Sequence, residues 1–175
     1  MRPPNLKSFH MSQLRITIVC LALLAGVAGD LSAQKSKEEK QEAAIKQQID
    51  SKKYVFVAER ALPMRGASRH LTSMYTLRVS KDSVIADLPY MGRAYAGAGY
   101  GGTEGGIKFV SAKNDYKITP RKKGGWDIRI KPLAARDSDV RELSLTVFNN
   151  GNASLQVLNN NRDQISFDGY IETKK

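Results

Sequence analysis

From Tyr54 onward, apolar and polar residues alternate along the chain with a period of two. The stretch ELSLTVFN places Leu143, Leu145 and Val147 on one side of an extended chain and polar residues on the other. Asn150-Gly151 follows, a dipeptide that favours a tight hairpin turn, and the alternation resumes in ASLQVLN. This pattern predicts half-buried β-strands joined by hairpins, so the fold is expected to be antiparallel β.

Similar runs are spread over residues 53–175 and predict about eight to nine short strands. The runs are YVFVA, HLTSMYTLRV, SVIADL, GIKFVSA, DYKIT, WDIRI, ELSLTVFN, ASLQVLN and ISFDGYI. Turn sequences such as SKDS, AKND, KKGG and NNGN separate neighbouring runs, which predicts a single antiparallel meander. A meander with exposed edges can remove them by curling, so we predict a mostly β barrel, with a β-sandwich as the alternative. Asp168-Gly169 inside the last run predicts a bulge or bend there.

The first 34 residues have the features of a secretory signal peptide. A basic leader precedes the apolar run ITIVCLALLAGVA, which is too short to span a membrane, and small and polar residues follow it. We therefore expect an exported protein, periplasmic, outer-membrane-associated or secreted, with no transmembrane segment in the mature chain. Cys20, the only cysteine, lies inside the apolar run rather than at its end, so we expect no lipid attachment.

Residues 35–52 are rich in helix formers and predict an N-terminal helix. Its apolar stripe consists of little more than Ile45 and Ile49, so the helix is expected to plug or flank one end of the β domain. The mature chain has no cysteine and one histidine, His70, which excludes disulfides and Cys/His zinc sites. We expect no metal and no cofactor.

The chain carries 28 Lys+Arg against 17 Asp+Glu, a formal net charge of +11. Such a charge suits nucleic acid, but export favours an anionic glycolipid or polysaccharide of the cell surface, and we expect no nucleic-acid partner. A protein that is simply basic, with no anionic partner, is the plainer alternative.

Gly97, Gly99 and Gly102 have the G-x-G-x-x-G spacing of a dinucleotide-binding loop. Such a loop needs a helix that opens at its last glycine, whereas TEGGIKFV predicts a strand here. We therefore interpret this stretch as a long loop between two strands, which serves either as a linker or as a functional loop.

Several stretches together resemble one family of exported proteins from Bacteroides-type bacteria, domain-of-unknown-function family 4251. These are YVFVAERALP, LTSMYTLRV, LPYMGRAY, KKGGW and NGNASLQVLNNNRDQISFDGYI, which together span roughly residues 54–171. The resemblance implies an envelope or secreted protein with a compact, mostly β fold that is similar to small lipocalin-like barrels. It implies no particular activity, cofactor or catalytic residue.

The glycine-rich loop carries the strongest candidate binding residues, Tyr90, Arg93, Tyr95 and Tyr100. Tyrosine and arginine are common binding anchors, and glycines let the backbone approach a partner closely. The alternative is structural: the tyrosines pack on the barrel rim and Arg93 pairs with a carboxylate.

Ser83 follows Asp82 and precedes Val84 at a predicted hairpin tip. This order resembles the Asp-Ser/Thr-apolar acceptor for O-glycosylation of exported proteins in such bacteria, and a plain turn is the alternative. We expect no catalytic residues. His70 lies at a strand start with no nucleophile-elbow pattern nearby, so we interpret it as a surface residue.

Taken together, these features predict a monomeric, exported, non-enzymatic barrel that binds a small ligand or a cell-envelope partner. The alternative is a hydrolase that acts on envelope glycans, which requires two convergent carboxylates. Its candidates, Asp127, Glu142 and Asp168, lie at strand positions that are expected to face outward.

Overall fold

The computed structural model describes residues 36–95, 105–135 and 138–173 of the chain. The chain divides into two compact units, Met1–Lys40 and Gln41–Lys175. In the first unit only residues 36–40 are described, and they are helical; in the second unit, residues 41–50 are helical. The predicted signal peptide lies outside the described residues.

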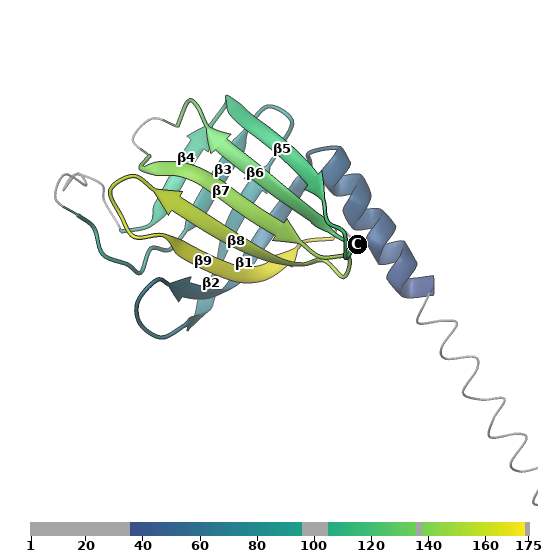
Figure 1. Ribbon diagram of the computed structural model, residues 1–175, viewed down its shortest axis with the longest axis horizontal. Coiled ribbons are helices and arrows are strands. Elements are labelled where there is room, and N and C mark those ends of the chain that lie inside the picture. Colours follow the sequence, from purple (N-terminus) through teal and green to yellow (C-terminus); the bar gives the residue numbers. More distant parts are fainter. Residues whose placement is uncertain (1–35, 96–104, 136–137, 174–175) are drawn as a thin grey trace, which may run out of the picture. The chain divides into compact units, whose positions relative to one another are not determined.

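Within the described residues, nine strands follow the helix and form a nearly closed barrel, which confirms the predicted fold class (Figure 1). The strands are β1 (Tyr54–Pro63), β2 (Arg69–Val79), β3 (Val84–Leu88), β4 (Ile107–Ser111), β5 (Asn114–Pro120), β6 (Trp126–Pro132), β7 (Val140–Val147), β8 (Asn152–Asn159) and β9 (Ile165–Ile171). Their order in the sheet is β4-β3-β2-β1-β9-β8-β7-β6-β5. The long-range pairing of β1 with β9 therefore joins two short meanders.

The apolar residues of the alternating pattern fill the barrel interior. In β6, Ile128 and Ile130 are 1% and 0% exposed. Asp127 and Arg129, which alternate with them along the strand, face outward. Full burial of one large apolar side chain contributes roughly 1.5–3 kcal/mol. The largest fully buried side chains are Phe56, Phe167, Ile45, Ile49, Leu77, Leu88, Ile107, Ile128, Ile130, Leu143, Leu145 and Leu155. The interior is thus a packed core.

The barrel has a seam between its two edge strands, β4 and β5. Every pairing in the sheet is antiparallel, so strand direction alternates along the order. Because β4 and β5 stand first and ninth in that order, they run in the same direction. Residues 112–113, predicted as part of a turn, are accordingly a bend and not a hairpin: the chain passes from one edge of the sheet to the other and continues.

The irregularity predicted at Asp168-Gly169 occurs in the pairing of β9 with β1, but the extra residue is on β1. Ala58 pairs with Gly169 and Arg60 with Asp168, which leaves Glu59 without a partner in the ladder. A Cβ on Gly169 would lie 1.9 Å from the carbonyl oxygen of Val57. Glycine is needed here because the two backbones approach too closely for any side chain.

The helix covers one end of the barrel, which we call the helix end. Ile45 and Ile49 are both 0% exposed, so the thin apolar stripe is fully used in packing. On either side of it, Gln41 Nε2 donates to the carbonyl of Asn150 at 2.7 Å and Gln48 Nε2 donates to the carbonyl of Glu172 at 3.1 Å. The opposite end, where β3 ends and β4 begins, is called the loop end.

Candidate functional site

At the loop end, the segment that follows β3 is bound to the turn between β8 and β9. The Tyr90 hydroxyl lies 2.8 Å from the carbonyl oxygen of Arg93 and 3.1 Å from that of Asp163. Backbone hydrogen bonds run from Asp163 N to Arg93 O at 3.0 Å and from Tyr95 N to Asn161 O at 2.9 Å. These contacts fix residues 90–95 against a turn that is about seventy residues away in sequence.

Asp163 is the centre of this arrangement. Its side chain accepts a hydrogen bond from the Tyr95 hydroxyl, and the residue is only 6% exposed. That hydrogen bond, together with the negative charge of Asp163, raises the pKa of Tyr95 above its ordinary value of 10.0. The Tyr95 ring itself remains 55% exposed. Asn159 Nδ2 donates to the Asp163 carbonyl at 3.1 Å, and Asn159 Oδ1 is buried without a partner in the described part of the chain.

Arg162, next to Asp163 in the same turn, joins three further segments. Its guanidinium lies 4.8 Å from the centroid of the Tyr90 ring, a cation–π contact. Its Nε is 3.4 Å from Asp139 Oδ2, and its Nη1 donates to the Gly106 carbonyl at 3.4 Å. The start of β4 and the start of β7 are thereby tied to the tyrosine segment.

Tyr90 and Gly106 of this frame also line a hollow of about 270 Å³, which we call the rim hollow. Its lining residues are Tyr75, Leu88, Pro89, Tyr90, Gly105, Gly106 and Lys108. A Cβ on Gly106 would lie 2.9 Å from the Leu88 carbonyl oxygen, so the glycine lets the two chain segments meet closely. Burial and the nearby charge of Asp163 raise the pKa of Tyr90, which therefore stays a neutral donor at physiological pH.

The structure brings together three of the four residues predicted to bind a partner. Tyr90 lines the rim hollow, Tyr95 contacts Asp163, and Arg93 contributes its carbonyl oxygen while its side chain is exposed. Tyr100 lies outside the described residues. Ser83 is half-buried in the turn that precedes β3, at the opposite end of that strand from Tyr90.

Sequence reasoning missed Arg162, Asp163 and Tyr75. The stretch NNNRDQ predicts only a turn, and charged residues in a turn carry no local sign of a distant partner. Tyr75 is partly buried and packs against the core, but its position in the rim hollow depends on how β2 and β3 pair. In both cases the site depends on contacts between residues that are far apart in the sequence.

A family model for the domain of unknown function DUF4251 matches residues 36–171. The chain belongs to the DUF4251 family. A crystal structure of a DUF4251 family protein from Bacteroides eggerthii DSM 20697 is similar to it, with a TM-score of 0.56 and 16% identity. The match covers 76% of this chain and 87% of that chain, and at this identity it shows the shared fold alone. No curated protein matches the chain.

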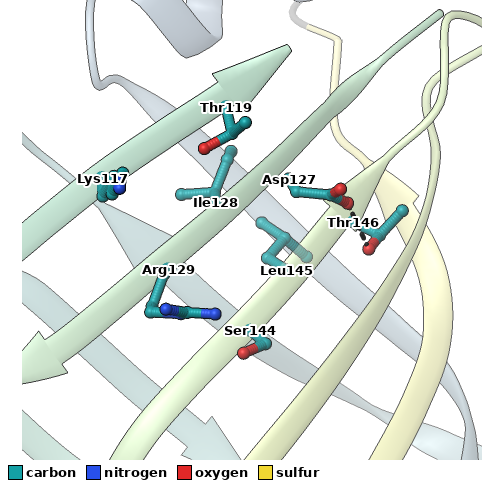
Figure 2. Close-up of a pocket in the computed structure, with 8 residues that line it drawn as sticks. All are labelled: Lys117, Thr119, Asp127, Ile128, Arg129, Ser144, Leu145 and Thr146. Carbon is teal, nitrogen blue, oxygen red and sulfur yellow. Dashed lines mark hydrogen bonds between the residues drawn. The ribbon is translucent and has the colours of Figure 1, made fainter. Parts of the chain in front are cut away.

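The outer face of this DUF4251 barrel has a further hollow of about 320 Å³ over β5, β6 and β7 (Figure 2). Asp127 is the one carboxylate among its lining residues, and it accepts a hydrogen bond from Thr146 at 2.8 Å. Arg121 Nε lies 3.5 Å from the same carboxylate. The hollow therefore lacks the second carboxylate that glycoside hydrolysis needs.

The other two carboxylates considered for hydrolysis are also engaged by cations. Glu142 lies 3.0 Å from Arg129 and 3.8 Å from Lys131, and Asp168 lies 2.6 Å from Arg60. Among the described residues, no group of three or more His, Cys, Asp or Glu side chains is placed to hold a metal ion. The described helix lacks the length and apolar character of a membrane span.

Proposed function

We propose that this DUF4251 protein is an exported, non-enzymatic binding protein of the cell envelope that holds its ligand in the rim hollow. The observation that carries the proposal is that Tyr75 and Tyr90 line one hollow at the loop end while the barrel interior is filled by side chains. Ligand binding inside the barrel, as in larger lipocalin-like barrels, would require that core to be emptied.

The lining of the rim hollow defines the kind of group that fits it. Tyrosine offers a flat apolar surface with a polar edge and loses little side-chain entropy on binding. Lys108 and the backbone at Gly105 and Gly106 add polar groups to the lining of the hollow. A small ligand, or part of an envelope component, with one apolar face and a polar edge suits this combination.

The hydrogen bonds around Asp163 support binding because they hold the hollow in shape before a ligand arrives. A preformed site avoids the entropy cost of ordering a loop during association. The same contacts imply that Tyr90 serves the frame as well as the hollow, whereas no hydrogen bond of the described structure depends on the Tyr75 side chain.

Binding is tested by presenting the protein with an extract of its native envelope and identifying the retained molecule by mass spectrometry. Tyr75→Ala should weaken retention by about 2 kcal/mol or more, as loss of a binding anchor does. Tyr170→Ala is the matched control, because Tyr170 is 39% exposed on the outer face of β9. Equal retention by wild type and Tyr75→Ala would contradict the proposal.

Export is tested separately, by mass spectrometry of the protein from its native host. The proposal requires an N-terminus between Asp30 and Lys35 and no acyl chain. Retention of Cys20, with or without lipid, would refute it. The same mass measurement examines Ser83, since a mass equal to the bare polypeptide excludes glycosylation there.

A further inference from the structure

A second hollow, of about 250 Å³, lies at the seam of the barrel, and we call it the seam hollow. It forms where the turn after the helix, the turn between β2 and β3, and the bend between β4 and β5 come together. Lys52, Lys81 and Lys113 line it, and Asp82 is the one carboxylate among its lining residues. The lining therefore carries an excess of two positive charges.

Among the described residues, some lysines of the protein are paired with carboxylates, whereas these three are not. Lys46 and Lys131 lie within salt-bridge distance of Asp50 and Glu142. No such pair joins Lys52, Lys81 or Lys113 to a carboxylate within the ranges that the structure describes. Their charges thus remain available to an anion.

Lys52 occupies a backbone position that favours glycine. Its φ is 52°, and it is the one non-glycine residue with a positive φ among the described residues. It ends the helix: Lys52 N donates to Ile49 O at 3.1 Å, and Lys53 N donates to Gln48 O at 3.0 Å. Glycine is usual at this point because it has no Cβ to clash in the left-handed conformation. Backbone strain of this kind is often found at functional sites.

The strained residue places its ammonium beside the hollow. Lys52 Nζ lies 4.7 Å from the centroid of the Tyr116 ring, which also lines the seam hollow. The Tyr116 hydroxyl is 3.0 Å from that of Tyr54, and burial raises the pKa of Tyr116 to about 12. The ring is therefore neutral at physiological pH and does not cancel the charge of the lysines.

We propose that the seam hollow binds the phosphate group of a phosphate monoester, with Lys52, Lys81 and Lys113 as its cationic contacts. A phosphate monoester carries about −1.5 to −2 charges at pH 7, which matches the excess of the lining. Lysine is a compact point charge that binds phosphate without demanding a fixed fork geometry.

The test is titration of the protein with glucose 1-phosphate, followed by the amide resonances of residues 80–83 and 112–116. Lys52→Gly should weaken binding about tenfold, since a charge-assisted contact is lost. Its melting temperature should not fall, because glycine adopts the positive φ without strain. Lys81→Ala should weaken binding to a similar degree. Lys53→Ala is the matched control: it removes the same charge one residue away from a side chain that lines the hollow.

A variant that should increase the affinity for glucose 1-phosphate strengthens the test. Asp82→Asn removes the one negative charge of the lining and should tighten binding of glucose 1-phosphate. Equal weakening by Lys53→Ala and Lys52→Gly would overturn the proposal, because it would show unspecific attraction to a basic surface. Failure of the wild-type protein to bind, or shifts confined to other residues, would overturn it as well.

The phosphate has two sources in an envelope, a soluble sugar phosphate or a lipid headgroup, and vesicles distinguish them. The vesicles contain phosphatidylcholine with phosphatidic acid, whose headgroup is a phosphate monoester, and binding is measured by sedimentation. Vesicle binding that glucose 1-phosphate displaces would place lipid-borne phosphate in the same hollow. If glucose 1-phosphate binds in the titration but displaces no vesicles, the hollow accepts only soluble phosphate.

Discussion

The two ends of the barrel are closed by different physical means. At the helix end, Ile45 and Ile49 are removed completely from solvent. At the loop end, the closing contacts are hydrogen bonds and a cation–π pair among Tyr90, Arg162 and Asp163. Apolar burial contributes more free energy and is tolerant of small shifts, whereas hydrogen bonds contribute less and depend strongly on geometry. The helix end is therefore suited to stability, and the loop end to holding the rim hollow in a defined shape.

The largest effect is expected at the helix end. Ile49→Ala should lower the free energy of unfolding by about 2–5 kcal/mol, because it leaves a cavity under the helix. Denaturant unfolding measures the loss. Lys46→Ala on the exposed side of the same helix is the control, since its ion pair with Asp50 is more than half exposed and should contribute little. Similar stability of both variants would mean that the helix does not seal the barrel.

Alkaline pH should also act mainly through the helix end. Burial raises the pKa of Tyr54 well above its ordinary value of 10.0 and that of Tyr116 to about 12. The unfolded chain then loses these protons first, so stability is fully present below pH 10 and declines as pH rises towards about 12. Melting temperatures measured from pH 8 to 12 should show this decline, and the double change Tyr54→Phe, Tyr116→Phe should reduce it. If the melting temperature of the double variant falls by the same amount, groups other than these two tyrosines cause the loss of stability.

A smaller effect is expected from the loop end. Tyr90→Phe keeps the ring under Arg162 but removes the hydroxyl that lies near the Arg93 and Asp163 carbonyls. Loss of this hydrogen bonding should cost about 0.5–1.5 kcal/mol of unfolding free energy. Tyr170→Phe on the outer face of β9 is the control and should cost less. A loss as large as that of Ile49→Ala would remove the contrast between the two ends.

The smallest effect concerns Tyr95, whose ring is 55% exposed. Tyr95→Phe should destabilise the protein less than Tyr90→Phe, because water replaces the lost partner of Asp163. Asp163→Asn should lower the pKa of Tyr95 towards 10.0, since the carboxylate that raises it becomes neutral. The ring resonances of Tyr95 during a pH titration report this pKa. An unchanged pKa would show that the hydroxyl does not bind Asp163 in solution.

The contrast between the ends also explains what the sequence predicted. Alternation assigned the inward faces of β3, β6, β7 and β8 correctly, because burial of every second residue is a local property. Ile45 and Ile49 were recognised as the apolar stripe of the helix for the same reason. The contact of Tyr95 with Asp163 joins residues 68 positions apart, and the extra residue Glu59 lies on the strand opposite the glycine that indicated it. Such features depend on pairing, which periodicity does not specify.

The bend at residues 112–113 has a consequence for chain connectivity. Each described hairpin turn connects two strands that are hydrogen-bonded to each other, whereas this bend connects the two strands that flank the seam. A circular permutant that begins at β5, and in which a linker joins β9 to the helix, would run through the sheet as one consecutive ladder. Its strands would pair almost entirely with their sequence neighbours, and chains with such low contact order fold faster. The natural order instead delays closure until β1 meets β9, so the permutant is expected to retain the barrel and to reach it sooner.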